Sequence, residues 1–163
     1  IWSAACSTGQ EPYSLAMNAI ESLPDLDSWD FKILGTDLSN YAVQQATAAT
    51  YEGDKLDGIP PAMRDRCLTK GADGLYRVAA DLRALVTIAR LNLMDPWPFK
   101  NKFNVIFCRN VMIYFDTETR RRLVMRFHDL LTPGGILAIG SAETLAGLDT
   151  PFTPAQASVY VKA

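Results

Sequence analysis

Short apolar runs alternate along this chain with longer segments whose apolar residues recur every three or four positions, and no other feature constrains the fold as strongly. The strand-like runs are 31–36, 103–108 and 136–139, and the helix-like segments are 11–23, 39–50, 61–67 and 116–131. Strands that alternate with helices in this way are typical of a parallel sheet with helices on its faces. The sequence therefore predicts an α/β fold, with edge strands in the tail near 152 and at 158–161.

Local signals mark where several of these segments begin and end. Ser39 and Asp116 are residues that favour a helix N-cap. Pro12 suits a first helical turn, because the N–H that it lacks has no partner in that turn. The Pro-Gly-Gly stretch at 133–135 ends the last helix before strand 136–139.

Residues 68–91 break the alternation. The segments 68–70 and 75–78 flank a turn with Gly71 and Gly74 at its ends, and 85–91 is a third extended run. Three short strands without a long helix between them predict a small antiparallel β-subdomain at 68–91, inserted into the larger sheet.

Length and composition fit one soluble catalytic or binding domain over 1–163. A net charge of −2 gives no overall basic field for nucleic acid, and no apolar run reaches the ~20 residues of a membrane span. The three cysteines are far apart and unpaired in sequence, which favours a reducing, cytoplasmic setting. With one histidine and no cysteine cluster, no metal site is expected. Because the chain begins at Ile1-Trp2, without Met, we expect a fragment of a longer protein.

Three stretches of small or polar residues follow predicted strands. They are the loop 5–11, Asp37, and 108–110. Ligands of open parallel sheets bind outside the carboxyl ends of the strands, where a carboxylate typically accepts hydrogen bonds from ribose hydroxyls. Each stretch alone also has a structural interpretation, as a tight turn or a helix entry. Together they predict a nucleoside cofactor, and although the loop lacks GxGxxG, the residues alone leave NAD open.

Five motifs, in this order, resemble the CheR-type chemotaxis receptor glutamate methyltransferases. They are WSAACSTGQEPYSLAM at 2–17, GTD at 35–37, LNL at 91–93, FCRNVMIYFD at 107–116 and LTPGGILAIGSAE at 131–143. The resemblance implies a Rossmann-like sheet that binds S-adenosylmethionine and releases S-adenosylhomocysteine. It also implies methyl transfer to glutamate side chains on the cytoplasmic helical domain of bacterial chemoreceptors, in the adaptation of chemotaxis signalling. We expect a monomer, although the sequence does not determine the oligomeric state.

The resemblance assigns cofactor contacts to residues at three of the strand ends. Glu11 looks like a contact on the first loop, and Asp37 resembles the acid that binds the ribose. Asn92 and Leu93 resemble the pair beside the adenine.

The fourth motif carries the residues nearest the reaction. Arg109 and Asn110 resemble the contacts to the methionine part of the cofactor, and Tyr114 looks like the active-site tyrosine beside the reacting methyl. We expect Tyr114 and Arg109 to position the reactants, so both are candidate catalytic residues. Glutamate has a reference pKa of about 4.3, so the nucleophile is ionised at neutral pH and needs no general base.

The chain also departs from the family pattern. Ser141-Ala142 stands where the family often has His-Ser, and Gln10 replaces a frequent Glu. The short turn 71–74 suggests an enzyme that does not depend on a C-terminal receptor pentapeptide. The family's N-terminal helical domain lies outside this chain, and inactivity of the chain by itself is compatible with the resemblance.

Three other functions remain open from the sequence. The first is a methyltransferase with another acceptor, such as RNA or a small molecule, which the slight net acidity and the lack of an NPPY-like motif disfavour. The second is a non-catalytic module that binds S-adenosylmethionine or S-adenosylhomocysteine and signals through a partner. The third is a NAD-binding oxidoreductase.

Overall fold

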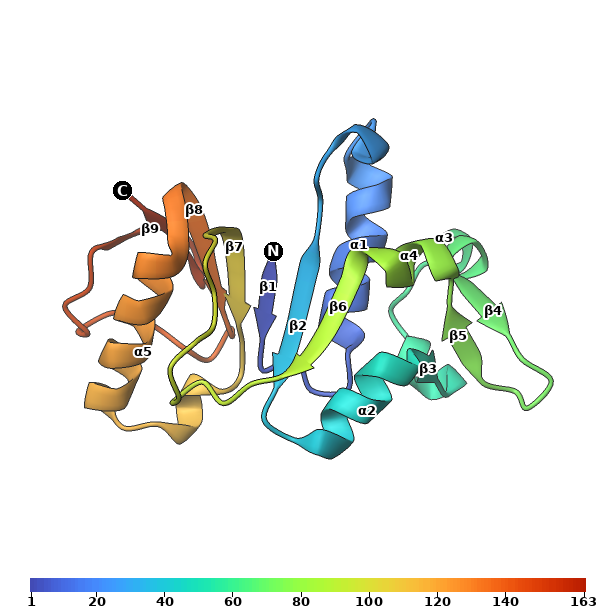
Figure 1. The fold of residues 1–163 in the computed structure, drawn as a ribbon, viewed down its shortest axis with the longest axis horizontal. Helices are drawn as coiled ribbons and strands as arrows, with labels where there is room; N and C mark the ends of the chain where they lie inside the picture. Colours follow the sequence, from blue (N-terminus) through green and yellow to red (C-terminus); the bar gives the residue numbers. More distant parts are fainter. The chain divides into compact units, whose positions relative to one another are not determined.

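The computed structural model describes residues 1–163, apart from the side chain of Asp27, and the chain divides into two compact units (Figure 1). Unit 1 consists of Ile1–Ala5 and Leu91–Ala163, and unit 2 of Cys6–Arg90. The first residues of the chain thus belong to the same unit as its C-terminal half. No helix among the described residues has the length and apolar character needed to cross a membrane.

Unit 1 is built on a sheet whose strands follow the order β1-β7-β8-β10-β9. Its elements are β1 (Trp2–Ala4), β7 (Phe103–Cys108), η3 (Met112–Tyr114), α5 (Thr117–Leu130), β8 (Leu131–Ile139), β9 (Phe152–Gln156) and β10 (Val159–Lys162). β7 runs parallel to both β1 and β8, whereas β10 is antiparallel to β8 and β9. The parallel part confirms the strand predicted at 103–108 and extends the one predicted at 136–139 back to Leu131.

An aromatic cluster forms much of the core of unit 1. Trp2 is fully buried and contacts four other rings, with centroid distances from 4.8 to 5.5 Å. The other members of the aromatic cluster are Trp97, Phe99, Phe103 and Phe127. Phe127 lies on the apolar face of α5 with Leu123 and Val124, all essentially without solvent contact. The helical spacing in the sequence therefore marked the correct face of α5.

Asp116 caps α5, as the sequence predicts, and its carboxylate accepts a hydrogen bond from the Thr119 N–H at 2.8 Å. Accepting backbone and side-chain hydrogen bonds from Thr119 holds the pKa of Asp116 below its usual value. A depressed pKa means that the cap stabilises the fold above the unfolded-state pKa, and that this contribution is lost as the pH falls through the folded-state pKa.

Replacing Asp116 with alanine is expected to lower Tm by about 2–4 °C at pH 7, because an unsatisfied helix N-terminus remains. Asp116→Asn should retain most of the stability, since asparagine is also a good N-cap. Thermal unfolding followed by circular dichroism measures both, and the difference between wild type and the alanine variant should shrink below about pH 3.8, the usual pKa of this group. An alanine variant with unchanged Tm at pH 7 contradicts the capping role.

Unit 2 combines a parallel strand pair with a small antiparallel sheet. Its elements are α1 (Gln10–Ser22), η1 (Leu26–Ser28), β2 (Ile33–Asp37), α2 (Asn40–Ala48), β3 (Thr50–Tyr51), η2 (Gly53–Leu56), α3 (Pro61–Cys67), β4 (Leu68–Lys70), β5 (Tyr76–Val78), α4 (Ala80–Leu85) and β6 (Val86–Arg90). α1, α2 and α4 pack on the parallel pair of β2 and β6. The cap predicted at Ser39 is confirmed by a hydrogen bond from the Ala42 N–H to the Ser39 hydroxyl at 3.3 Å.

The small sheet confirms the predicted hairpin but not its third strand. β4 and β5 pair antiparallel around the turn 71–74, as expected. The run predicted as the third strand, 85–91, instead forms β6 and pairs in parallel with β2. The third strand is β3, which precedes the hairpin and pairs with β5. The prediction was wrong because α4 turns the chain away from the hairpin, while a strand of two residues leaves no periodic signal in the sequence.

Candidate functional site

The loop that follows β1 is held within unit 2 by hydrogen bonds to and from its backbone. The Cys6 N–H donates to the Thr36 carbonyl at 2.8 Å, and the Tyr51 hydroxyl donates to the Thr8 carbonyl at 2.9 Å. Gly9, with a φ of +94°, turns the chain into α1. A Cβ at Gly9 would lie 2.9 Å from the Ala46 Cα, so both the conformation and the close approach require glycine. The small-residue loop predicted from the sequence is therefore tightly packed against α2.

Asp37 lies at the end of β2 and organises this loop. One carboxylate oxygen accepts a hydrogen bond from the Ser7 N–H and the other from the Ser39 N–H, both at 2.9 Å. A carboxylate offers about four acceptor positions, so about two remain for a ligand. Asp37 is half-buried at the end of β2, so its carboxylate is partly accessible to solvent.

Glu11 belongs to the same unit, in the first turn of α1, and is half-buried. Burial, together with the nearby negative charges of Asp37 and Glu11, raises the pKa of the Cys6 thiol to about 12. A raised pKa keeps the thiol protonated at neutral pH, and the buried Cys6 side chain contributes packing to this loop.

Asn92 and Leu93 lie in unit 1 and begin a turn that the sequence did not indicate. The Met94 N–H donates to the Asn92 side-chain oxygen at 3.0 Å, and the Asp95 N–H donates to the Asn92 carbonyl at 3.2 Å. The side chain of Leu93 is buried, with 7% of its surface exposed. The candidate adenine pair thus sits in a defined turn.

Arg126 of α5 stabilises this turn through hydrogen bonds to two of its carbonyl groups. This residue was not predicted from the sequence. Its guanidinium donates to the Leu93 carbonyl at 2.6 Å and to the Asp95 carbonyl at 2.5 Å, and lies 3.7 Å from the centroid of the Trp97 ring. Burial lowers the pKa of Arg126, although an arginine remains charged in proteins. One sequence signal was available for Arg126. It stands three residues after Leu123, which places it beside the apolar face of α5.

The segment after β7 carries the remaining candidates. Arg109 and Asn110 are exposed, and Asn110 has a φ of +60°. Tyr114 ends η3 with 79% of its surface exposed. The Glu143 carboxylate accepts hydrogen bonds from the N–H groups of Asn110 and Met112. Sequence reasoning had noted Glu143 only as part of a motif.

The candidate residues divide between the two units. Glu11 and Asp37 lie in unit 2 around the first loop. The remaining candidates lie in unit 1, at the two segments described above: Asn92, Leu93, Arg109, Asn110 and Tyr114. Among the residues that the structure describes, no three His, Cys, Asp or Glu side chains form a group that could hold a metal ion.

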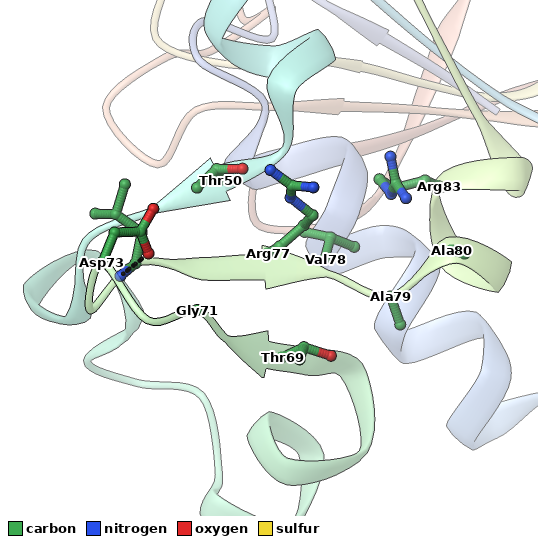
Figure 2. Close-up of a pocket in the computed structure, with 10 residues that line it drawn as sticks. Thr50, Thr69, Gly71, Asp73, Arg77, Val78, Ala79, Ala80 and Arg83 are labelled. Atoms are coloured by element: carbon green, nitrogen blue, oxygen red, sulfur yellow. Dashed lines mark hydrogen bonds between the residues drawn. The ribbon is translucent and has the colours of Figure 1, made fainter.

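A hollow of about 330 Å³ lies on the small sheet of unit 2 (Figure 2). Its lining includes Thr50 of β3, Thr69 of β4, Arg77 of β5 and Arg83 of α4. In Figure 2 the guanidinium groups of Arg77 and Arg83 lie on the same side of β5 as Thr50. None of the predicted cofactor residues lines it, so it is a feature of the small sheet and separate from the first loop.

Comparison with solved structures shows the fold. The chain resembles the magnesium protoporphyrin IX methyltransferase of Synechocystis, crystallised with bound S-adenosylmethionine, with a TM-score of 0.59 over 99% of the chain and 69% of that protein, at 15% identity. It also resembles the cyclase SpnF, with a TM-score of 0.51 over 85% of the chain and 36% of that protein, at 19% identity. These likenesses confirm the predicted α/β, Rossmann-like methyltransferase fold.

Sequence comparison shows the family. A probable chemotaxis protein methyltransferase of Rhizobium etli is 44% identical over 90% of the chain, and a chemotaxis protein methyltransferase of Escherichia coli is 36% identical over 98%. The chain spans 56% and 57% of the lengths of these two relatives. The profile of the CheR methyltransferase SAM-binding domain matches residues 1–161. The chain therefore belongs to the family of CheR methyltransferase SAM-binding domains.

Proposed function

We propose that this chain binds S-adenosylmethionine and takes part in methyl transfer to glutamate side chains of bacterial chemoreceptors, as a cytoplasmic monomer that adapts chemotaxis signalling. The cofactor proposal rests on the position of Asp37 at the end of β2. Its carboxylate accepts hydrogen bonds from the Ser7 and Ser39 N–H groups and keeps further acceptor positions for a ligand. Membership of the CheR family supports the methyl transfer and the receptor substrate.

The first loop and the end of β2 fit a nucleoside. Gly35 lets β2 pack closely against β6 and the first loop, because a Cβ there would lie 2.7 Å from the Ile88 side chain and 3.2 Å from the Cys6 sulfur. Asp37 would accept hydrogen bonds from the ribose hydroxyls, and Glu11 would contribute a further contact on the same loop. Asn92 and Leu93 would lie beside the adenine, in the turn that Arg126 fastens.

The reaction requires alignment more than acid–base catalysis. The cofactor supplies a methyl group on a positively charged sulfur, and the glutamate carboxylate of the receptor is already ionised at neutral pH. Arg109 and Asn110 would hold the methionine part, and the exposed Tyr114 would orient the incoming carboxylate. Correct orientation of two reactants can lower the activation free energy by up to about 7–11 kcal/mol.

The small sheet is the proposed docking surface for the receptor. Arg77 and Arg83 give its hollow two positive charges against one negative charge, that of Asp73, and a net positive lining suits an acidic receptor surface. The hairpin turn has only four residues, Gly71 to Gly74, and we propose that docking does not depend on a C-terminal receptor pentapeptide.

Isothermal titration calorimetry with S-adenosylhomocysteine and, in parallel, NADH tests the cofactor proposal. Binding of the former without binding of NADH is the expected result. Binding of NADH alone would point to an oxidoreductase. A chain that binds S-adenosylhomocysteine, in a full-length protein that leaves receptor glutamates unmethylated, would instead be a non-catalytic module.

Replacing Tyr114 with phenylalanine in the full-length enzyme is expected to lower kcat by about 10- to 100-fold, with the affinity for S-adenosylmethionine changed less than about threefold. The reason is that the hydroxyl, on a side chain 79% exposed at the end of η3, would contact the reactants and contribute little to cofactor binding. Transfer of radiolabelled methyl groups to receptor fragments measures kcat. Tyr41→Phe, at a similarly exposed tyrosine, is the matched control, and an unchanged kcat for Tyr114→Phe removes Tyr114 from the mechanism.

A further inference from the structure

Glu143 accepts hydrogen bonds from three backbone N–H groups of unit 1. One carboxylate oxygen accepts from Asn110 at 3.0 Å and from Gly140 at 2.6 Å, and the other accepts from Met112 at 2.8 Å. Asn110 and Met112 follow β7, whereas Gly140 follows β8. A single side chain thus joins the segments that leave two neighbouring parallel strands.

The turn that carries Glu143 is itself well anchored. The Glu143 N–H donates to the Gly140 carbonyl at 2.9 Å, and the Ser158 hydroxyl donates to the same carbonyl at 3.2 Å. A Cβ at Gly140 would lie 2.7 Å from the Glu143 carboxylate and 2.9 Å from the Asn110 nitrogen. Only a glycine at position 140 therefore allows the carboxylate and the Asn110 backbone to come this close.

Glu143 binds the backbone of the segment that carries two candidate residues. Asn110 is a candidate contact to the methionine part of the cofactor, and Tyr114 is a candidate contact to the substrate. Asn110 has a φ of +60°, in the left-handed region that asparagine adopts more readily than other non-glycine residues, so this residue type suits the sharp turn after β7. Met112 begins η3, the short helix that ends at Tyr114. Hydrogen bonds from N–H groups to an ionised carboxylate are shorter and stronger than neutral ones, so they can keep this segment in one conformation.

We propose that Glu143 is a positioning residue for the methionine part of the cofactor, and that it acts by fixing the backbone of Asn110 and the start of η3. The proposal rests on the proposed function, in which Arg109 and Asn110 contact that part. Glu143 itself does not touch the cofactor in this account. Its removal should therefore weaken recognition of the amino-acid end and leave recognition of the adenosine end intact.

Glu143→Gln separates these two ends, because the glutamine has the shape of glutamate but its amide nitrogen cannot accept a hydrogen bond. Two ligands are titrated by calorimetry: S-adenosylhomocysteine and 5′-methylthioadenosine, which lacks the amino-acid end. We expect the affinity for S-adenosylhomocysteine to fall by about tenfold and that for 5′-methylthioadenosine to change less than about twofold. Glu118→Gln, at an exposed glutamate in the first turn of α5, should change neither.

Each outcome is decisive. Equal weakening of both ligands means that Glu143 only supports the fold, and unchanged binding of both means that the segment holds its conformation without it; either result overturns the proposal. If the glutamine variant does not fold, as judged by its thermal unfolding, Glu143→Asp is titrated in its place, with the same expectations. Failure of the wild-type chain to bind S-adenosylhomocysteine counts against the proposed function, and is seen before any variant is made.

Discussion

Asp37→Ala is expected to weaken binding of S-adenosylhomocysteine at least about 100-fold, beyond what routine calorimetry detects. Two effects add in this variant. The ribose hydroxyls lose their acceptor, and the Ser7 and Ser39 N–H groups lose the carboxylate to which both donate at 2.9 Å. Hydrogen bonds to a charged group contribute about 1.5–3 kcal/mol each, so losing two ribose contacts is enough for this loss of affinity.

A conservative variant and a control variant test whether the loss of affinity comes from the Asp37 carboxylate itself. Asp37→Asn keeps one acceptor oxygen and is expected to lose about tenfold in affinity, because the amide cannot accept on its nitrogen. Asp30→Ala removes an exposed carboxylate from the same unit and should leave binding unchanged. Thermal unfolding of the ligand-free alanine variant checks that the first loop remains folded. If a folded Asp37→Ala chain binds S-adenosylhomocysteine as well as wild type does, Asp37 does not bind the ribose.

Trp2→Ala is expected to reduce the free energy of unfolding by about 3–5 kcal/mol. Trp2 is fully buried and contacts all four other members of the aromatic cluster, so its removal leaves a large cavity in the core of unit 1. Domains of this size are typically stable by about 5–15 kcal/mol, so the variant would lose about a fifth or more of a typical free energy of unfolding. Urea unfolding followed by circular dichroism measures the change.

Trp29→Ala is the matched control, because that side chain is 58% exposed. Its truncation should change the free energy of unfolding by no more than about 0.5 kcal/mol. Similar losses in the two tryptophan variants would mean that the aromatic cluster does not stabilise the chain more than an exposed ring does.

Features with strong local signals were predicted from the sequence, whereas contacts between distant residues were not. The bounds Pro61–Cys67 and Phe103–Cys108 follow from a proline pair and from an apolar run flanked by polar residues. β3 was missed because two residues carry no periodicity, and α4 because six residues give less than two helical turns.

The same division holds for the candidate site. Asp37 was identified because it follows a strand, which is a local property. Arg126 and Glu143 were not identified from the residues, because their roles depend on carbonyl and N–H groups about 30 residues away in the sequence. The sequence shows which side chains are present at a strand end, but hydrogen bonds of this kind appear only once the fold places two segments side by side.

The strands of the small sheet come from both sides of α3 in the sequence, and this matters for the design of chimeric proteins. β3 precedes α3 and the hairpin of β4 and β5 follows it, so exchanging the hairpin alone leaves Thr50 and Tyr51 beside a foreign β5. A transplant of the proposed docking surface has to span residues 50–78 as one segment. That segment also carries the Tyr51 hydroxyl, which donates to Thr8 in the first loop. An exchange of the proposed docking surface between relatives therefore also exchanges one support of the first loop.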